Sequence, residues 1–337
     1  MRLYTTYDVI TVGGATEDIN FHVNNYHLID NNQNAAGNKL FAFDYGTKVN
    51  IEKVDMSFGG GAANAAVSFA SLGLRTACLT ACGDDDRGRK IIANFKARGV
   101  STDLVQKVSK EISGFSFIVI GAKNEHVAFS HRAANSKLSI TSSIISKLAR
   151  AKWLFVTSFS GSWKADFDQL FSLAERLKIA WNPGEDQLAA GFAGLSKYLK
   201  RTTVLTFNKD EAVKLVVSHR DYKYKSYDFL VDSQNLLRAI HAWGPKIVVI
   251  TNGEKGADAY DGHNFYHQNI IKPKAKVDTT GLGDAFGSAF IASLQLLGSD
   301  ITAALAVAAH NSSSVLAKQG AQNGVLTKAD FARLTKT

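Results

Sequence analysis

The stretch Asp278-Thr279-Thr280-Gly281-Leu282-Gly283-Asp284 lies between an extended segment and a long apolar helical pattern at 284–297. Backbone N–H groups in the first turn of a helix have no acceptor within the helix, and the helix dipole is positive there. Gly281 and Gly283 carry no side chain that would keep an anion away from these donors. The stretch therefore predicts an anion site suited to a transferring phosphoryl group, with Asp284 at the same point. The simpler alternative is an ordinary helix N-cap, where Asp is favoured anyway.

A second glycine-rich turn, Gly60-Gly61-Ala62-Ala63-Asn64, also opens a helical pattern. Its small residues allow a polar ligand to approach the backbone, and the Asn64 amide can both donate to and accept from hydroxyl groups. The turn has neither the G-x-G-x-x-G spacing of a dinucleotide fingerprint nor the Gly-Lys-Ser/Thr of a Walker A loop. It predicts a site for a hydroxylated ligand, and tight packing between helix and sheet is the alternative.

Two polar segments follow predicted strands in the second half of the chain. Asn208 and Glu211 stand three residues apart after the strand at 203–207, on one face of a helical turn. An amide and a carboxylate there could hold Mg²⁺ through water, although an ordinary capped helix start explains the same pattern. The segment Thr251-Asn252-Gly253-Glu254-Lys255-Gly256 follows the next strand. Its Gly-x-x-Gly turn could lie along the phosphates of a nucleotide.

Strand and helix patterns alternate through most of the chain and predict an α/β fold. Alternation of this kind favours a parallel sheet with helices on both faces, a Rossmann-like three-layer sandwich. The expected strands are 8–13, 75–81, 153–157, 178–181, 203–207 and 246–251. The expected helices include 62–72, 87–98, 166–177, 233–242, 284–297 and 301–317.

Two patches of extended sequence, 15–57 and 113–133, interrupt this pattern. We expect them to pair as one small β-sheet outside the body, which leaves residues 1–14, 58–112 and 134–337 for the body. Such a sheet would act as a lid over the C-terminal strand edges, where open α/β sheets bind ligands. Within the patches we expect a loop at 31–39 and a hairpin turn at 121–124.

Composition argues against several functional classes. The 337 residues are 45% hydrophobic and 20% charged, which is typical of a globular protein with a substantial core. The two cysteines, Cys78 and Cys82, lie in an apolar stretch and are expected to be buried free thiols. The net charge of +9 is scattered along the chain, so we expect no nucleic-acid partner. Residues 1–8 lack the apolar core of a signal peptide, and no long apolar run follows, so we expect a cytoplasmic protein without a membrane span.

Together these motifs resemble those of the ribokinase-like (PfkB) carbohydrate kinase family, and the resemblance covers nearly the whole chain. Gly60–Ala66 resembles the first signature of the family and Asp278–Asp284 resembles the second. The segments at 208–211 and 251–256 fall in order between the two signatures. The resemblance implies an ATP-dependent kinase that transfers the γ-phosphoryl group to a hydroxyl of a small sugar.

The resemblance also implies a role for individual residues. Asp284 would be the general base, and the backbone of Gly281, Leu282 and Gly283 would form the anion hole. The residues implied to bind substrate hydroxyls are Asp18, Gly60, Gly61 and Asn64. The residues implied to bind the nucleotide are Asn208, Thr251, Gly253, Gly256 and His310. The residues implied to serve cations are Glu211 for Mg²⁺, through water, and Asp278 and Thr280 for a monovalent cation such as K⁺.

Two residues depart from the family pattern, and the substrate stays open. Leu282 stands where Ala is usual, and Gly61 replaces a Lys found in many ribokinases, so ribose is not implied as the substrate. A neutral sugar suits Asp18 and Asn64, and an adenosine-like nucleoside is the alternative within the class. Arg132, at the end of the second lid hairpin, could instead meet an acidic or phosphorylated sugar, and a solvated charge on the lid is the alternative for this residue.

Two alternatives come from other classes. One is a non-catalytic sugar- or nucleotide-binding protein on the same fold, against which Asp284 and Glu211 argue. The other is an NAD-dependent oxidoreductase, which fits the α/β body but lacks the dinucleotide fingerprint. The resemblance also implies a homodimer in which the exposed lid sheets of two copies pair.

Overall fold

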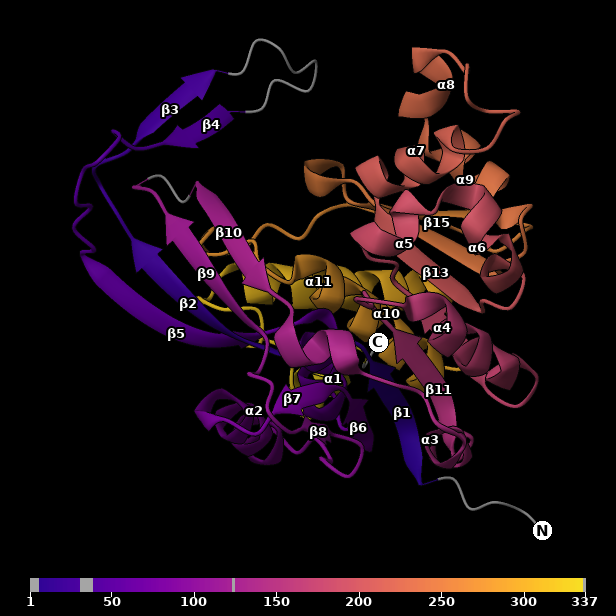
Figure 1. The fold of residues 1–337 in the computed structure, drawn as a ribbon. Helices are drawn as coiled ribbons and strands as arrows, with labels where there is room; N and C mark the ends of the chain where they lie inside the picture. The colour runs from indigo at the N-terminus through magenta and orange to yellow at the C-terminus, as the bar shows by residue number, and fades with distance from the viewer. Residues whose placement is uncertain (1–5, 31–38, 123–124, 336–337) are drawn as a thin grey trace.

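A computed structural model describes residues 6–30, 39–122 and 125–335 of the chain. The loop that we predict at 31–39 lies almost wholly outside these ranges. The predicted turn at 121–124 and the N-terminal segment at 1–8 lie partly outside them. Figure 1 shows a large body of sheet and helices, with a separate set of strands standing beside it.

The body is built on one eight-stranded sheet (Figure 1). In spatial order its strands are β16 (Phe265–Gln268), β15 (Ala257–Tyr260), β14 (Ile247–Thr251), β13 (Val204–Asn208), β12 (Lys178–Trp181), β11 (Ala151–Val156), β1 (Tyr7–Val12) and β6 (Thr76–Leu79). The six strands from β14 to β6 run parallel, and β15 and β16 run antiparallel at the edge. Our sequence patterns missed this antiparallel pair, because both strands are short and mix polar with apolar residues.

Helices cover both faces of the sheet, which confirms the three-layer α/β prediction. The helices on one face are α3 (Ser142–Leu148), α4 (Trp163–Ser172), α5 (Glu185–Ala189), α6 (Gly191–Leu199), α7 (Lys209–Val217) and α9 (Ser233–His241). Those on the other face are α1 (Gly61–Ser71), α10 (Leu282–Leu296), α11 (Ile301–Leu316) and α12 (Lys328–Leu334). The remaining helical segments are α2 (Asp86–Ala97), α8 (Tyr227–Val231), η1 (Ala133–Lys137), η2 (Leu173–Glu175) and η3 (Gly253–Lys255).

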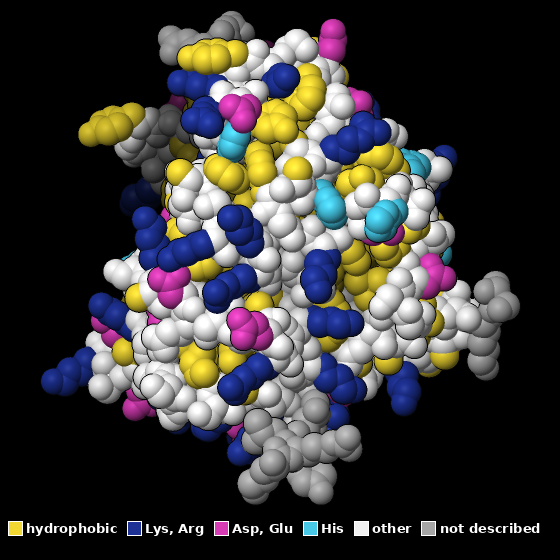
Figure 2. All heavy atoms as spheres, turned by 90° about the vertical axis from the view of Figure 1, so that its right-hand side faces the viewer, with side chains coloured by type: hydrophobic (Ala, Val, Ile, Leu, Met, Phe, Trp, Pro, Cys, Tyr) yellow, Lys and Arg dark blue, Asp and Glu magenta, His cyan; other side chains and the backbone are white. Residues whose placement is uncertain are grey.

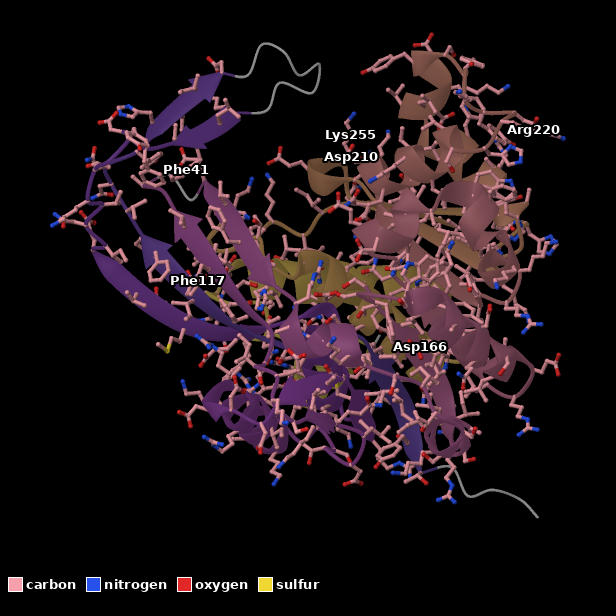
Figure 3. The ribbon with its side chains drawn as sticks, viewed as in Figure 1. Phe41, Phe117, Asp166, Asp210, Arg220 and Lys255 are labelled. Carbon is pink, nitrogen blue, oxygen red and sulfur yellow. The ribbon has the colours of Figure 1, made fainter. Side chains whose placement is uncertain are left out.

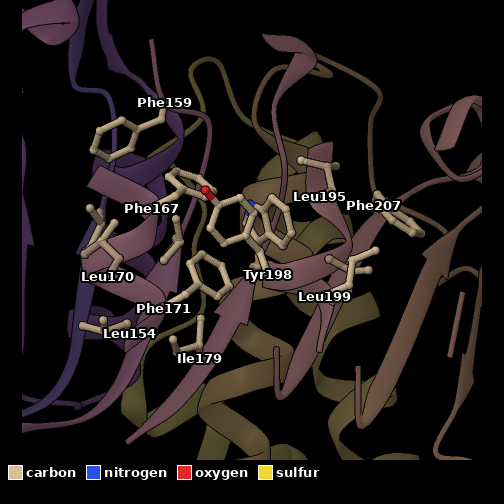
Figure 4. Close-up of a cluster of buried hydrophobic side chains, with 14 of the residues drawn as sticks. Leu154, Phe159, Phe167, Leu170, Phe171, Ile179, Leu195, Tyr198, Leu199 and Phe207 are labelled. Atoms are coloured by element: carbon tan, nitrogen blue, oxygen red, sulfur yellow. The ribbon is translucent and has the colours of Figure 1, made fainter. Parts of the chain in front are cut away.

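Each sheet strand contributes side chains to two separate cores, because successive strand residues point to opposite faces. In β11, Leu154 and Val156 enter one core, whereas Trp153 and Phe155 enter the other. Figure 4 shows the first core, in which Tyr198 lies among the buried aromatic rings. Its hydroxyl donates to Asp168 Oδ1 at 2.9 Å, so the polar end of this buried side chain is satisfied.

The strands beside the body form a four-stranded sheet of their own. In spatial order they are β10 (His126–His131), β9 (Phe115–Ile120), β2 (Thr16–His22) and β5 (Lys53–Gly59). The shorter pairs are β3 (His27–Asp30) with β4 (Lys39–Ala42), beyond this sheet, and β7 (Ala81–Gly83) with β8 (Gln106–Val108) in the body. The four strands, which we call the lid sheet, lie in the ranges 15–57 and 113–133 except for the last two residues of β5, which extend to Gly59. That this sheet moves as a lid stays a prediction.

The root of the lid sheet is tied to the body by ion pairs. Glu17 on β2 is buried, and its carboxylate contacts Arg87 at 3.1 Å and Lys90 at 2.9 Å, both on α2. Removing one partner of a buried ion pair is costly, because the remaining charge is left without compensation. The pairs therefore fix the end of β2 that leads into Asp18.

Charged side chains and thiols are distributed as the composition suggests. Figure 2 shows Lys and Arg spread over one face of the molecule, with Asp and Glu between them. Cys78 and Cys82 are buried free thiols, as predicted, and burial raises the pKa of each to about 12. Among the helices of the described residues, none combines the length and apolar character needed to cross a membrane.

Candidate active site

The predicted site segments meet at the edge of the body sheet where the parallel strands end. The last residues of β13 and β14, Asn208 and Thr251, stand opposite each other in register. Helix α7 begins directly after Asn208, and α1 packs against α10. Open α/β sheets bind their ligands at this edge. Figure 3 shows Asp210 and Lys255 on the body at this edge, with Phe41 and Phe117 on the strands across from it.

The run Asp278–Asp284 forms a turn that is held at both ends. Gly281 is the N-cap of α10 with a left-handed φ of 72°, so the helix begins at Leu282. The Asp278 carboxylate accepts hydrogen bonds from the N–H of Thr280 at 2.9 Å and the N–H of Gly320 at 2.8 Å. The first-turn N–H groups of α10 are thereby presented in a fixed direction, which favours the anion-hole prediction over a plain N-cap.

The two glycines of this run are present for different reasons. A Cβ at Gly281 would lie 2.4 Å from Cβ of Ala321, so packing and the positive φ both require glycine there. A Cβ at Gly283 would meet nothing within 4 Å. Gly283 therefore leaves open space beside its N–H, and no protein atom fills that space.

The Asp284 side chain is half-buried and is held by Asn64, whose Nδ2 donates to Asp284 Oδ2 at 2.9 Å. Burial raises the pKa of Asp284 to about 6, and the nearby carboxylate of Glu211 adds to this rise. The hydrogen bond from Asn64 acts in the opposite direction. A carboxyl with a pKa close to neutrality is suited to general-base catalysis.

Asp18 is buried on β2 of the lid sheet, and its Oδ1 accepts a hydrogen bond from the hydroxyl of Thr16 at 2.9 Å. Burial is the largest cause that raises the pKa of Asp18, and the charges of Asp278 and Glu17 add to it. A Cβ at Gly59 would lie 2.0 Å from Asp18 Oδ2. Asp18 therefore sits where the lid sheet meets the start of α1, close enough to the run Asp278–Asp284 for the charge of Asp278 to act on it.

Gly60 and Gly61 are explained by packing at the start of α1. Gly60 has φ of 92°, and a Cβ there would lie 2.5 Å from the carbonyl oxygen of Gly14. A Cβ at Gly61 would lie 3.2 Å from Asp284 Oδ1 and would press on the carboxylate. These contacts favour the packing alternative for both residues, and direct contact with a substrate stays a prediction.

Asn208 and Glu211 cap α7 with a reciprocal pair of hydrogen bonds. Asn208 Oδ1 accepts from the N–H of Glu211, and Glu211 Oε2 accepts from the N–H of Asn208, both at 2.9 Å. This is the capped helix start that the sequence left as an alternative. Burial, with the charge of Asp210, raises the pKa of Glu211. Because the Glu211 charge also acts on Asp284, the capping pair lies close enough to take part in the site.

A cavity of about 330 Å³ lies beside the turn at Gly281–Gly283. Its lining includes five residues that the sequence predicted for the nucleotide or the phosphoryl group, namely Thr251, Gly253, Gly256, Leu282 and Gly283. Its apolar walls are formed by Ile270, Ile271, Pro273, Leu282, Phe286 and Leu316. Leu282 thus keeps its backbone in the turn while its side chain extends the apolar wall, a role that the sequence pattern did not indicate.

His310 does not line this cavity, and the nucleotide role that the resemblance implies for it stays a prediction. Ala309 lines the cavity together with Ser312, Ser313 and Leu316 of the same helix. His310 instead lines a different cavity, with Asp300, Ala303 and Val307. Successive side chains of a helix point about 100° apart, so the neighbours Ala309 and His310 lie on different faces of α11.

A second cavity, of about 400 Å³, separates the lid sheet from the run Asp278–Asp284. Its lining includes Asn20, Ile118, Ile120 and His126 of the lid sheet, and Lys276, Asp278, Thr280 and Gln319 of the body. Lys276 lines both cavities and pairs with Glu254 at 2.6 Å. We did not predict Lys276 or His126 as site residues, since each is a lone charged or polar residue in an irregular or exposed segment.

Known proteins resemble this chain over most of its length. The model of the pfkB family carbohydrate kinases matches residues 27–328. An uncharacterised sugar kinase of Archaeoglobus fulgidus is 25% identical over 78% of this chain and all of its own length. A ribokinase of Haemophilus influenzae is 25% identical over 82% of this chain and 87% of its own.

Solved structures share the fold over nearly the whole chain. Arabidopsis thaliana ribokinase, solved with ribose and ATP, has a TM-score of 0.80 at 20% identity, covering 98% of this chain and 99% of its own. A Burkholderia thailandensis nucleoside kinase, solved with inosine, has a TM-score of 0.76 at 18% identity and covers 97% of both chains.

The fold and the family match define a phosphotransferase with an alcohol group as acceptor, of the sugar or nucleoside kinase type. The chain belongs to the pfkB family of carbohydrate kinases, whose model covers most of its length.

Proposed function

We propose that the protein transfers the γ-phosphoryl group of ATP to a hydroxyl of a small sugar, with Asp284 as the general base. The observation that carries the proposal is the position of Asp284 in the first turn of α10. Gly283, one residue before it, lines the apolar cavity, and Thr280, four residues before it, lines the cavity against the lid sheet. The carboxylate therefore stands where a donor and an acceptor would meet.

The proposed chemistry is in-line displacement at the γ-phosphorus. Asp284 takes the proton of the acceptor hydroxyl as its oxygen attacks, a contribution of about 10²–10⁴-fold in rate. The N–H groups of Leu282 and Gly283, at the positive end of α10, stabilise the charge that spreads over the equatorial oxygens. The cavity of about 330 Å³, which we call the nucleotide cavity, has apolar walls that suit a purine ring.

The described residues suit a metal ion that is bound to the nucleotide phosphates better than a metal ion held by protein side chains alone. Among them, no group of three or more His, Cys, Asp or Glu side chains is arranged to hold a metal. Glu211 uses Oε2 for the α7 cap, so Oε1 can accept from a metal-bound water. Bound there, Mg²⁺ would neutralise phosphate charge. We also keep K⁺ beside Asp278 and Thr280 as a proposal, although Asp278 already accepts two backbone hydrogen bonds.

A neutral sugar is our first choice of acceptor, because Asp18 and the Asn64 amide suit vicinal hydroxyls. A nucleoside is the second candidate, favoured by the second cavity. Ile118 and Ile120 give that cavity an apolar wall beside the buried Asn20, and a nucleobase has both apolar faces and polar edges.

An ATP-depletion assay over pentoses, hexoses, sugar phosphates and nucleosides tests the proposal. We expect ADP to appear only with an accepted substrate, together with the phosphorylated product. The matched control is Asp284→Asn, which should bind ATP and produce no more ADP than a reaction without acceptor. Binding of a sugar or nucleoside without turnover on any acceptor would favour the non-catalytic alternative.

We also propose that the lid sheets of two copies pair in a homodimer. Asp18, Asn20 and Ile118 are buried toward the body, so the alternate residues of the same strands form the outer face. That outer face is apolar across all four strands, and Met56 and Phe129 are 65% and 60% exposed. Light scattering on Met56→Lys and Phe129→Lys should give monomers, with His126→Lys on the inner face as the control. A monomeric wild-type protein would overturn the proposal.

A further inference from the structure

A chain of three side-chain amides leads from α2 to the catalytic carboxylate. Asn94 Nδ2 donates to Gln322 Oε1 at 2.8 Å, and Gln322 Nε2 donates to Asn64 Oδ1 at 3.2 Å. Asn64 Nδ2 then donates to Asp284 Oδ2 at 2.9 Å. Gln322 and Asn64 are 3% and 5% exposed, so water cannot readily replace these partners.

Each link in this chain fixes the direction of the next amide. An amide has an acceptor end and a donor end, so occupying the acceptor end turns the donor end outward. Because Asn94 donates to Gln322 Oε1, the amino group of Gln322 is directed at Asn64. Because Gln322 donates to Asn64 Oδ1, the amino group of Asn64 is directed at Asp284. A reversed chain would present the Asn64 oxygen to the carboxylate and would favour protonated Asp284.

The turn that carries Gln322 is itself held to the catalytic run. The N–H of Gly320 donates to Asp278 at 2.8 Å, and Ala321 packs against Gly281. Asn323 Oδ1 accepts from Arg98 at the end of α2 at 2.9 Å. Three successive positions before Asn323 therefore contact the start, the middle and, through Asn64, the end of the run Asp278–Asp284.

We propose that Gln322 is a positioning residue that, with Asn94, orients the Asn64 amide so that its donor end faces Asp284 at the reaction centre. This inference rests on the proposed function of Asp284. The charged group that faces Asp284 from a neighbouring element is Glu211 on α7, whereas α1 presents the amide of Asn64. Asp278 lies at the other end of the run, facing Asp18 and Gly320. The amide chain thus favours the ionised form of Asp284.

The test is the pH dependence of kcat/KM in variants that break or reverse the chain. Gln322→Met removes the chain without a charge change and should lower kcat about three- to tenfold. Asn94→Asp, at a half-buried surface position, cannot donate to Gln322 and should reverse the chain. Gln322→Glu should do the same. Both acidic variants should move the acid limb of the profile upward by about one pH unit, with activity recovering at higher pH.

Two controls separate orientation from charge. Asn323→Asp makes the same amide-to-acid change one residue away at an exposed position, and its acid limb should stay in place. In an Asn64→Ala background the chain is already broken, so Gln322→Glu should no longer shift the limb. A shift that persists in that background, or wild-type profiles for Gln322→Met and both acidic variants, would overturn the proposal. If Asp284→Asn itself turned over normally, the proposed function would fail instead, so the two failures are distinguishable.

Discussion

The amide of Asn64 donates a 2.9 Å hydrogen bond to the carboxylate of Asp284, joining the first turns of α1 and α10 across 220 residues of sequence. The bond brings the two glycine-rich turns that stand out in the sequence into one site. It also favours the ionised form of a carboxyl whose pKa burial raises to about 6. The ionised form of Asp284, which the proposed reaction needs, is therefore the form that lowers the stability of the fold.

Asp284→Asn should stabilise the fold at neutral pH, because it removes a carboxyl that is costly to ionise in the folded protein. The folded pKa, about 6, lies above the ordinary value of 3.8, so ionisation lowers stability as pH rises. The gain should be about 1–3 kcal/mol above pH 7, shrink as pH falls through about 6 and vanish below about pH 4. Urea unfolding over this range measures it. The exposed Asp186→Asn is the matched control, and an equal pH-dependent gain there would contradict the account.

Gly283→Ala and Gly281→Ala should behave in opposite ways. Gly283 lies in the first turn of α10 with free space around it, so alanine should leave stability unchanged or raise it by up to about 1 kcal/mol. Its methyl group would stand in the nucleotide cavity and should raise KM for ATP about tenfold or more. Gly281→Ala should destabilise the fold by about 2 kcal/mol or more, since both φ and Ala321 exclude a Cβ. Thermal unfolding and ATP kinetics on both variants separate the two roles.

Asp18→Asn should weaken acceptor binding and leave the nucleotide alone. A hydrogen bond to a charged group contributes about 1.5–3 kcal/mol, so KM for the acceptor should rise about 10- to 100-fold. KM for ATP should change less than about threefold, because Asp18 lies on the lid sheet and does not line the nucleotide cavity. The control is Asp55→Asn, whose carboxylate pairs with His22 and Lys53 on the same sheet. Equal effects of Asp18→Asn on both substrates would contradict the assignment.

Substitutions at two consecutive positions of α11 should separate the nucleotide cavity from its neighbour. Ala309→Leu places a large side chain in the cavity and should raise KM for ATP about tenfold. His310→Ala should leave it within about twofold, because His310 lines the other cavity. Steady-state kinetics with ATP varied provide the comparison, and a larger effect at His310 would show that the helix presents the opposite face to the nucleotide.

The parallel core of the fold was predictable because its strands are buried on both faces. Such strands appear as continuous apolar runs, and β12 was predicted with the observed bounds, 178–181. The antiparallel edge strands β15 and β16 were not predicted, because their partly exposed residues give no continuous apolar run. The reciprocal cap of α7 was visible as a spacing, but the spacing alone could not tell a cap from a metal site.

The candidate site was predictable where one local segment carries the chemistry, as in Asp278–Asp284. Residues that act through distant contacts were not predictable, because no local pattern marks them. Gln322 lies 258 positions from Asn64 in sequence, and its hydrogen bond exists only in the folded chain. His310 shows a related limit, because the phase of α11 must be known to within one residue to tell whether His310 or Ala309 lines the cavity.

The central claim is that Asp284 is the base that accepts the proton of the acceptor hydroxyl, and its most direct test is acceptor-dependent ADP formation by the wild type and Asp284→Asn. We predict that the wild type loses kcat/KM as pH falls through about 6, where Asp284 becomes protonated. Asp284→Asn should fold, bind ATP with unchanged affinity, turn over about 10²–10⁴-fold more slowly above pH 7 and show no acid limb near pH 6. A folded Asp284→Asn protein with near-wild-type turnover, or one that keeps the same acid limb, would contradict the account.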